Sequence, residues 1–417
     1  MSQETKRVLI LGSRNYGNRR ILFELKKLKM KAQIVEPKHF VLAISNTNGN
    51  DKIYYKGKRI FKNSIDFVIS RIGTDFKTGL KVLEHLQNNL KIACTASATG
   101  LEMASDKFLC SQILSQAEVK TPKSVHFKDT NEYGLLKKLV GGYPFVVKLN
   151  RGSQGAGVFL INDDLAGSTA LSTISKISMV CLQQYIESAI KDAKKCDIRM
   201  FVVAGKVIAS MKRFSIKSDF RSNYSISKEA INHKPTERQI ELALKAAKSL
   251  DNMNICGVDI VTSIETGEDY VIECNGNPGT GIAKITGINI FEKIAEMAQN
   301  WSNDKSGELC YNPGSSNPIN LEAKRKYSTP EEKYHNDEIF EFDDNDPGAN
   351  ENEVAPNYET EQEFNSKIFD NSVSWMTNVL DNDVLQNFDN SVNLSHLQHQ
   401  RQQVIQELHQ IITEKKY

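Results

Sequence analysis

The sequence predicts a protein of mixed α/β and α+β class, in which a small open parallel sheet precedes a larger unit of antiparallel hairpins. Three observations support this prediction. The chain opens with alternating strands and helices, short apolar runs separated by turns follow from about residue 98, and an acidic polar extension follows residue 301. Alternation of strands with helices favours parallel sheets, whereas consecutive short strands favour antiparallel ones.

The first unit, residues 1–97, is expected to be a small α/β domain. An apolar run over Arg7–Gly12 predicts its first strand, and an amphipathic stretch over Arg20–Lys31 predicts the helix that follows. The alternation continues with strands at Ala32–Glu36 and Asp66–Ser70 and a helix at Gly79–Asn89. The early glycines are spaced GxxxxG rather than GxGxxG, so tight turns explain them better than a dinucleotide site does.

The second unit, residues 98–301, is expected to combine helices with antiparallel strands. One helix is predicted at Ser105–Gln116, with Ser105 or Asp106 as its N-cap, and another at Thr236–Leu250, where Ala and Leu recur on one face. The remaining predicted elements are strands at Val125–Phe127, Phe145–Leu149, Val158–Ile161, Val180–Tyr185, Ile198–Val203 and Val207–Lys212, a hairpin of Cys256–Ile264 and Asp269–Cys274, and a closing helix at Ile290–Trp301.

The C-terminal extension differs in composition from the rest of the chain. Residues 302–360 are rich in Asn, Ser, Pro, Asp and Glu, which predicts a largely disordered linker. Apolar residues recur at helical intervals within residues 361–417, where Leu397, Val404 and Ile411 are spaced by seven. We therefore expect short helices there, which would form either a coiled-coil seam, and so a homo-oligomer, or a docking helix.

Charge is divided unevenly along the chain. The 417 residues carry a net charge of +2, but residues 1–301 hold 44 Lys and Arg against 29 Asp and Glu, whereas residues 302–417 hold 9 against 22. A basic body predicts anionic ligands, although solvated Lys-rich helix faces would give the same excess. The acidic tail is predicted to be an appendage to that body.

The cysteines and the N-terminus indicate the compartment. The seven cysteines are scattered and include no CxxC pair, so neither a zinc site nor a disulfide framework is predicted. Polar residues lead directly into the first strand without a signal-peptide pattern, and no apolar stretch has the length of a membrane span. We expect a cytoplasmic protein with no membrane partner and no direct nucleic-acid partner.

A glycine-rich loop between two predicted strands is the first candidate site. The strand Phe145–Leu149 carries Lys148 and precedes the loop Gly152-Ser-Gln-Gly-Ala-Gly157. Successive backbone N–H groups in such a loop suit phosphate oxygens, and the lysine would add a point charge. No GK[ST] follows, so this is not a Walker loop, and a glycine-rich hairpin without a ligand stays open as the alternative.

The predicted hairpin brings two acids together. If Glu265-Thr266-Gly267 forms the loop, with Gly267 in the left-handed conformation, Asp259 faces Glu273 directly. Alternation then places Asn275 on the same face as Glu273. Facing carboxylates repel unless a cation lies between them, and oxygen-only ligands suit Mg²⁺. The apolar flanks of both strands disfavour the alternative of two solvated surface acids.

Two weaker groups complete the candidates. Asp197 and Arg199 lie on one predicted buried strand and suggest a fixed pair, which is compatible with a purely structural role. Arg213 follows on the next strand, and a polar loop over Asp219–Asn223 contains Arg221, Ser222 and Asn223, which suit an anion.

Residues Arg7 to Trp301 resemble the RimK-type ATP-grasp ligases, which add glutamate to protein or small-molecule carboxylates. Order and spacing agree throughout, so the resemblance does not depend on a single motif. The matching stretches are Tyr55-Lys-Gly-Lys, Arg71-Ile-Gly73, Ser105-Asp-Lys107, Val147-Lys148, Gly152 to Gly157, Cys196-Asp-Ile-Arg199, Asp219-Phe-Arg-Ser-Asn223, Gly257-Val-Asp259 and Glu273-Cys-Asn-Gly-Asn-Pro-Gly279. The resemblance implies an ATP-grasp fold preceded by a pre-ATP-grasp domain.

The resemblance also implies a role for each matching residue. ATP would be bound by Lys107, Lys148, Gly152, Ser153, Gln154, Gly155 and Gly157, by the hinge Gln184–Tyr185 at the adenine edge, by Asp197 near the ribose, and by Arg221, Ser222 and Asn223. Asp259, Glu273 and Asn275 would hold two Mg²⁺, which Mn²⁺ could replace, with Glu273 bridging them. Arg213 or Arg221 would stabilise the oxyanion of the second step.

The implied reaction forms an acyl phosphate and ADP, after which an amine, that of glutamate, attacks the acyl carbon. The acceptor is a carboxylate such as a protein C-terminus, and the acidic tail would compete with it, position it, or only self-associate. Three departures leave the substrates open: Gln184 replaces a frequent Glu, about four residues are inserted near Ile190–Lys194, and the loop Asn277–Gly281 is short. The rivals are a ligase for another amino acid, a peptide macrocyclase, an NAD-dependent oxidoreductase and a non-catalytic nucleotide-binding scaffold.

Overall fold

The structure is a computed structural model of the chain and describes residues 5–45, 51–128, 132–151, 157–177, 179–189, 194–215, 229–303 and 338–343. All of these residues belong to one compact unit, Met1–Val354, and a second unit comprises Ala355–Tyr417. The helices predicted in residues 361–417 therefore lie outside the described residues. Within the described part of the chain, no helix has both the length and the apolar character that a membrane span requires.

The N-terminal sheet is parallel, as predicted. Its strand order is β2-β1-β6-β7, formed by β1 (Arg7–Gly12), β2 (Lys31–Val35), β6 (Phe67–Arg71) and β7 (Ala93–Cys94), with helices α1 (Tyr16–Lys27) and α2 (Phe76–Asn88) between them. Helix α1 begins before the predicted Arg20 because the Asn15 side chain caps it, accepting a bond of 2.9 Å from the Asn18 backbone N–H.

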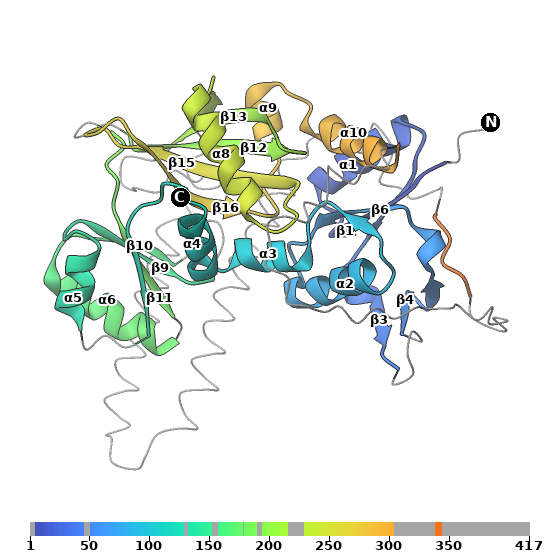
Figure 1. Ribbon diagram of the computed structural model, residues 1–417, viewed down its shortest axis with the longest axis horizontal. Coiled ribbons are helices and arrows are strands. Elements are labelled where there is room, and N and C mark those ends of the chain that lie inside the picture. Colours follow the sequence, from blue (N-terminus) through green and yellow to red (C-terminus); the bar gives the residue numbers. More distant parts are fainter. Residues whose placement is uncertain are drawn as a thin grey trace, which may run out of the picture. The chain divides into compact units, whose positions relative to one another are not determined.

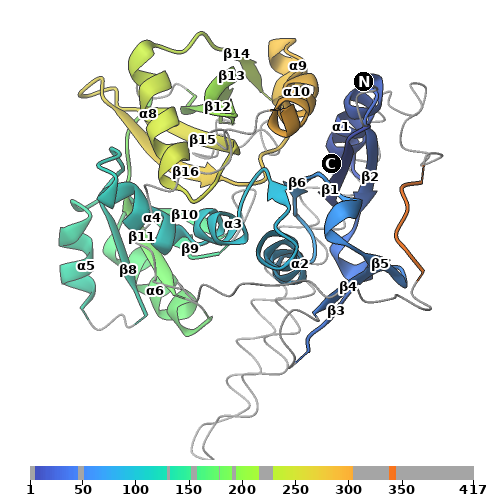
Figure 2. The ribbon, with the colours of Figure 1, turned by 45° about the vertical axis from the view of Figure 1, so that its right-hand side comes forward.

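The helix at the end of the predicted catalytic part of the chain, residues 98–301, covers this sheet. Helix α10 (Ile290–Asn303) lies beside α1 in both ribbon views (Figure 1, Figure 2). Its Phe291 ring meets Tyr16 edge-on at 6.1 Å, and Trp301 lies 6.0 Å from Phe67 on β6. Ile294 shares an apolar core with Leu22 of α1. The helix that was predicted to close residues 98–301 therefore packs on the N-terminal sheet.

A second small sheet was not predicted. Its antiparallel strands are β3 (Phe40–Ala43), β4 (Lys52–Tyr55) and β5 (Lys58–Ile60), and single 3₁₀ turns, η1 (Pro37–His39) and η2 (Lys62–Ser64), lie on either side. Lys56 and Gly57 both have positive φ, +51° and +82°, as a two-residue hairpin turn requires.

Residues 338–343, within the predicted linker, pack against this small sheet. The Arg59 backbone N–H donates to the Glu338 carbonyl at 2.7 Å, and the Phe340 N–H donates to the Arg59 carbonyl at 2.9 Å. Phe340 is 5% exposed and its ring lies 6.0 Å from that of Tyr55. This short strap, residues 338–343, therefore fastens the extension to the N-terminal part of the chain.

Two antiparallel sheets form the larger part of the unit (Figure 1). The four-stranded sheet has the order β10-β9-β11-β8, formed by β8 (Ser124–Phe127), β9 (Phe145–Leu149), β10 (Val158–Ile161) and β11 (Val180–Gln184), with helices α5 (Tyr133–Leu139) and α6 (Asp164–Ile177). The five-stranded sheet has the order β14-β13-β12-β15-β16, formed by β12 (Cys196–Val203), β13 (Lys206–Phe214), β14 (Ala230–Asn232), β15 (Ile255–Thr262) and β16 (Asp269–Asn275), with helices α8 (Glu237–Ser249) and α9 (Ile282–Thr286).

The helix predicted at Ser105–Gln116 is confirmed, and a further helix precedes it. These are α3 (Ala98–Ser105), which was not predicted, and α4 (Lys107–Gln116). Asp106 lies between them in an extended conformation and caps α4, because its Oδ1 accepts a bond of 3.0 Å from the Leu109 N–H. Asp106, rather than Ser105, is thus the cap, and it fixes Lys107 at the first position of α4.

Candidate active site

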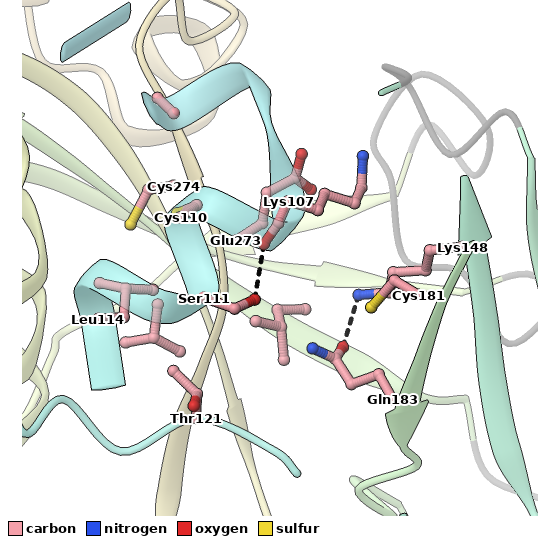
Figure 3. Close-up of a pocket in the computed structure, with 13 residues that line it drawn as sticks. Lys107, Cys110, Ser111, Leu114, Thr121, Lys148, Cys181, Gln183, Glu273 and Cys274 are labelled. Atoms are coloured by element: carbon pink, nitrogen blue, oxygen red, sulfur yellow. Dashed lines mark hydrogen bonds between the residues drawn. The ribbon is translucent and has the colours of Figure 1, made fainter. Parts of the chain in front are cut away.

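A pocket lies between the four-stranded sheet and strand β16 (Figure 3). It is a small cavity of about 20 Å³ that opens to solvent. Its polar and charged lining comes from α4, from β9 and β11, and from β16. The described lining residues are Ala104, Lys107, Cys110, Ser111, Leu114, Thr121, Lys148, Cys181, Gln183, Val271, Ile272, Glu273 and Cys274. Two lysines and an acid that the sequence singled out therefore share one cavity.

Lys148 reaches the pocket from β9. It pairs with Cys181 across β9 and β11, and its Nζ donates to the Gln183 Oε1 at 2.6 Å. Burial lowers the pKa of Lys148, whereas Glu273 favours its charged form. Burial likewise raises the pKa of the Cys181 thiol to about 11, although Lys148 favours the thiolate, so this cysteine is neutral and a poor nucleophile.

The metal-site prediction depended on the pairing of β15 and β16, which the structure confirms. Asp259 pairs directly with Glu273, and Gly257 pairs with Asn275. Gly267 has φ +66°, the left-handed conformation that was expected. The register contains one difference: the turn is longer than predicted, and a bulge between Asp259 and Ile260 restores the pairing.

The two facing acids differ in their partners. Asp259 is 2% exposed and is held by two arginines: Arg199 donates from Nε and, at 2.8 Å, from Nη2, and the Nη2 of Arg213 forms an ion pair with it at 3.0 Å. Burial raises the pKa of Asp259, but the two guanidinium groups outweigh burial and lower it. Glu273, half-buried, forms no hydrogen bond or ion pair within the part of the chain that the structure describes.

The expected pair of Asp197 with Arg199 is wrong, because each has another partner. Arg213 donates to both oxygens of Asp197, from Nε at 2.6 Å and from Nη2 at 2.7 Å. Burial lowers the pKa of Arg213, but Asp197 and Asp259 outweigh burial and raise it. Among the described residues, the Nη1 of Arg213 has no bonded partner, so this nitrogen is the one that could meet a reacting group.

Other predicted residues occupy the rim or lie outside the description. Gln184 ends β11, where its Oε1 accepts a bond of 3.3 Å from the Lys123 N–H, and Tyr185 follows it. Gly157 has φ +70°, and a Cβ there would lie 2.5 Å from Leu149, so glycine is required. The residues outside the described part are Gly152, Ser153, Gln154, Gly155, Arg221, Ser222 and Asn223.

Sequence reasoning missed Gln183 and the acid partners of the arginines. Gln183 lies two residues after Cys181 and so faces the same side as Lys148. Alternation along β11 places Gln183 and Gln184 on opposite faces of the sheet. The sequence alone does not show which of these faces carries Lys148. Arg199 and Arg213 lie on β12 and β13, which are joined by the two-residue turn Ala204-Gly205, but their pairing with Asp259 depends on the register of β12 with β15, for which the sequence offers no turn signal.

Comparisons with known proteins identify the family of this chain. The chain matches the model of the RimK-like ATP-grasp domain over residues 104–298 and that of the RimK pre-ATP-grasp domain over residues 7–101. A probable alpha-L-glutamate ligase of Halorhodospira halophila is 32% identical over 294 residues, which cover 70% of this chain and 94% of that protein. A protein of the same name from Vibrio atlanticus is 33% identical over 61% of this chain and 83% of its own. The chain belongs to the RimK-type ATP-grasp ligases.

Solved structures show the same fold. The ATP-grasp ligase PsnB in complex with its minimal precursor has a TM-score of 0.55 at 14% identity, over 72% of this chain and 99% of that chain. A RimK domain ATP-grasp protein of Sphaerobacter thermophilus has a TM-score of 0.51 at 15% identity, over 70% and 98%. The predicted ATP-grasp fold and the predicted enzyme class, an ATP-grasp ligase, are thus confirmed.

The donor set of this ligase fits a magnesium site. Asp259, Glu273 and Asn275 offer only oxygen and amide donors, as Mg²⁺ prefers. Asp259 accepts two N–H bonds from Arg199 and forms an ion pair with Arg213, and a carboxylate has about four lone-pair positions, so Asp259 keeps room for a cation. From Asn275 the ligand would be the amide oxygen, Oδ1, since the Nδ2 group can only donate. The described residues contain no cluster of three or more His, Cys, Asp and Glu that could hold a metal, but the predicted set has only two acids.

Proposed function

We propose that this ligase uses ATP and Mg²⁺ to join a carboxylate acceptor to the amine of glutamate through an acyl phosphate. The observation that supports it best is the unpaired carboxylate of Glu273, which lies opposite Asp259 in the same pocket as Lys107 and Lys148. The relatives named probable alpha-L-glutamate ligase support glutamate as the amine. Residues 1–97 would act as the pre-ATP-grasp domain and residues 98–301 as the catalytic domain.

The cation would be held by Asp259, Glu273 and Asn275, with Glu273 between two ions. Bound Mg²⁺ would neutralise the phosphate oxygens and orient the chain of phosphates for in-line transfer. Mn²⁺ accepts similar oxygen donors and is expected to replace it. Because Arg199 and Arg213 already neutralise Asp259, Glu273 supplies most of the unbalanced negative charge that attracts the cations.

The nucleotide would be bound from both sides of the pocket. Lys107 and Lys148 would contact the phosphates, where their charges form strong charge-assisted bonds. The loop Gly152–Gly157 would donate backbone N–H groups to the same phosphates. The adenine edge would meet Gln184 and Tyr185 at the end of β11.

Two bond exchanges complete the reaction. An oxygen of the acceptor carboxylate attacks the γ-phosphorus, and the bond to ADP breaks. The amine then attacks the acyl carbon, loses a proton and expels inorganic phosphate. Arg213, through its Nη1, and Arg221 would donate to the oxyanion that forms between these events.

The test is incubation of the purified protein with ATP, Mg²⁺, L-glutamate and a short peptide that ends in glutamate. We expect ADP and phosphate in equal amounts, together with a peptide heavier by one glutamyl residue. A panel of other amino acids tests the first alternative, and loss of water within one peptide would indicate a macrocyclase. Formation of AMP and pyrophosphate would contradict the proposal, as would unchanged turnover in the Glu273→Gln variant.

A further inference from the structure

Arg71 is a buried cation that has no acidic partner among the residues that the structure describes. It ends β6 and is 4% exposed. Its Nε donates to the Asn18 Oδ1 at 3.4 Å and its Nη2 to the Pro278 carbonyl at 3.0 Å. Its Nη1 is buried and, within the described chain, has no hydrogen-bond partner. The other two buried arginines near the site, Arg199 and Arg213, are both paired with carboxylates.

A guanidinium group in this state has unused binding capacity. Burial lowers the pKa of Arg71 to about 10, so the group is charged at neutral pH. It has five N–H donors and uses two, both on neutral oxygens. Burial of an unpaired charge is costly, and proteins usually keep such a group only where an anion compensates it.

The surroundings of Arg71 contain further unpaired polar groups. Asn277 precedes Pro278 in the loop after β16, and its Oδ1 is buried without a partner, as is the Asn275 Nδ2. A Cβ added to Gly73, two residues after Arg71, would lie 3.2 Å from the Asn277 amide nitrogen. The loop that follows β16 thus lies against the end of β6 in the parallel sheet, and ligands of open α/β sheets bind at such strand ends.

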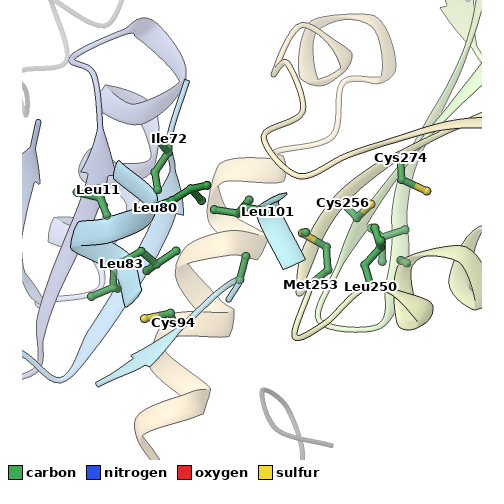
Figure 4. Packing of buried hydrophobic residues seen from close by; sticks show 14 of the residues in the cluster. Leu11, Ile72, Leu80, Leu83, Cys94, Leu101, Leu250, Met253, Cys256 and Cys274 are labelled. Atoms are coloured by element: carbon green, nitrogen blue, oxygen red, sulfur yellow. The ribbon is translucent and has the colours of Figure 1, made fainter. Parts of the chain in front are cut away.

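The same loop links Arg71 to the reaction site. A Cβ added to Gly257 would lie 2.8 Å from Pro278 and 2.9 Å from the Arg199 guanidinium group, which binds Asp259. One hydrophobic cluster, which includes Ile72 and Leu101, continues from the parallel sheet to β15 and β16 (Figure 4). Pro278, whose carbonyl binds Arg71, therefore packs against β15, the strand that carries Asp259.

We propose that Arg71 binds a carboxylate of a ligation substrate, one that is not itself activated. Both oxygens of a carboxylate held by the guanidinium fork are engaged, so the carboxylate that attacks ATP is a different one. Because Nη1 is covered, binding requires the loop over residues 276–281 to shift. The inference rests on the proposed function for its substrates, either glutamate or the acceptor.

The experiment compares Arg71→Met, Arg71→Lys and wild type. Arg71→Met should raise the KM of one carboxylate substrate about 10- to 100-fold and leave the dissociation constant of MgATP, measured by calorimetry, within about twofold. Arg71→Lys keeps the charge but not the fork and should recover part of the loss. Arg238→Met, at an arginine whose side chain is 56% exposed and which pairs with the buried Asp269, is the control and should change neither constant. The KM of glutamate and that of the glutamate-ended peptide identify which substrate supplies the carboxylate.

A second readout needs no turnover. Removal of an unpaired buried charge should leave the melting temperature of Arg71→Met equal to or above that of wild type. L-glutamate or the peptide should raise the melting temperature of wild type but not of this variant. An unchanged KM for both substrates, with equal melting shifts in both proteins, would show that Arg71 is only structural. If wild type performs no ligation but shows an Arg71-dependent shift, the proposed function fails and the carboxylate site stands.

Discussion

Replacement of Asp259 by Asn changes the charge balance at the centre of the site. Asp259 is 2% exposed and neutralises two buried arginines. Asparagine keeps the shape but removes the charge, so Arg213 keeps only Asp197 and Arg199 keeps no acid. Removal of one partner from a buried ion pair costs about 3–5 kcal/mol of unfolding free energy. At about 2 °C per kcal/mol for a chain of this size, the melting temperature should fall by about 6–10 °C.

Glu273→Gln is the matched variant on the facing strand. Glu273 lies directly opposite Asp259 but has no partner in the described chain, so loss of its charge should change stability by no more than about 0.5 kcal/mol. Both variants should lose ligation. The two proteins are compared with wild type by calorimetric melting in the presence of a chelator and without nucleotide, and then by ADP release with Mg²⁺.

The contrast between the two variants tests the assignment of roles. If Glu273→Gln lost as much stability as Asp259→Asn, Glu273 would be a structural counter-ion rather than a free cation ligand. If the melting temperature of Asp259→Asn equalled that of wild type, the ion pairs of Asp259 with the two arginines would not stabilise the fold. Each result refutes a different half of the reasoning.

Lys148, the strap over residues 338–343 and His126 give the remaining tests. Lys148→Ala should weaken MgATP binding about 10- to 100-fold by calorimetry, because a charge-assisted contact is lost; unchanged affinity would exclude the phosphate contact. Phe340→Ala should reduce the free energy that holds the strap on the small sheet by about 3–5 kcal/mol, so limited proteolysis should cut the strap. Ile339 is 56% exposed, so Ile339→Ala should not have this effect. Burial lowers the pKa of His126 to about 4, so unfolding takes up a proton below pH 6.5; stability should therefore fall from pH 6.5 to pH 4 in wild type and less in His126→Phe, as denaturant melts would reveal.

Local signals in the sequence predicted the strand pair at the centre of the site. Gly267 marks the turn and period-two alternation places Asp259 opposite Glu273, as observed. The predicted turn was too short, because the observed turn is longer than three residues and a bulge beside Ile260 compensates for the difference. Bulges depend on the packing of both strands, so a single sequence does not predict them.

Longer-range contacts were beyond the sequence pattern. Arg199 and Arg213 lie on β12 and β13, whereas Asp259 lies on β15. The register of β12 against β15 is set by tertiary packing. The strap was missed because Ile339, Phe340 and Phe342 lie among acidic residues typical of disordered segments. A weak local signal is the alternation of apolar and acidic residues over residues 340–343, which is typical of a strand.

The most direct test of the proposed chemistry follows an oxygen atom. The acceptor peptide is labelled with ¹⁸O in its carboxylates and incubated with ATP, Mg²⁺ and L-glutamate, and the inorganic phosphate is analysed by mass spectrometry. If an acyl phosphate forms, the attacking oxygen stays with phosphorus when the amine displaces it, so each phosphate should contain one ¹⁸O atom. Unlabelled phosphate, or label recovered in AMP, would contradict the acyl-phosphate route.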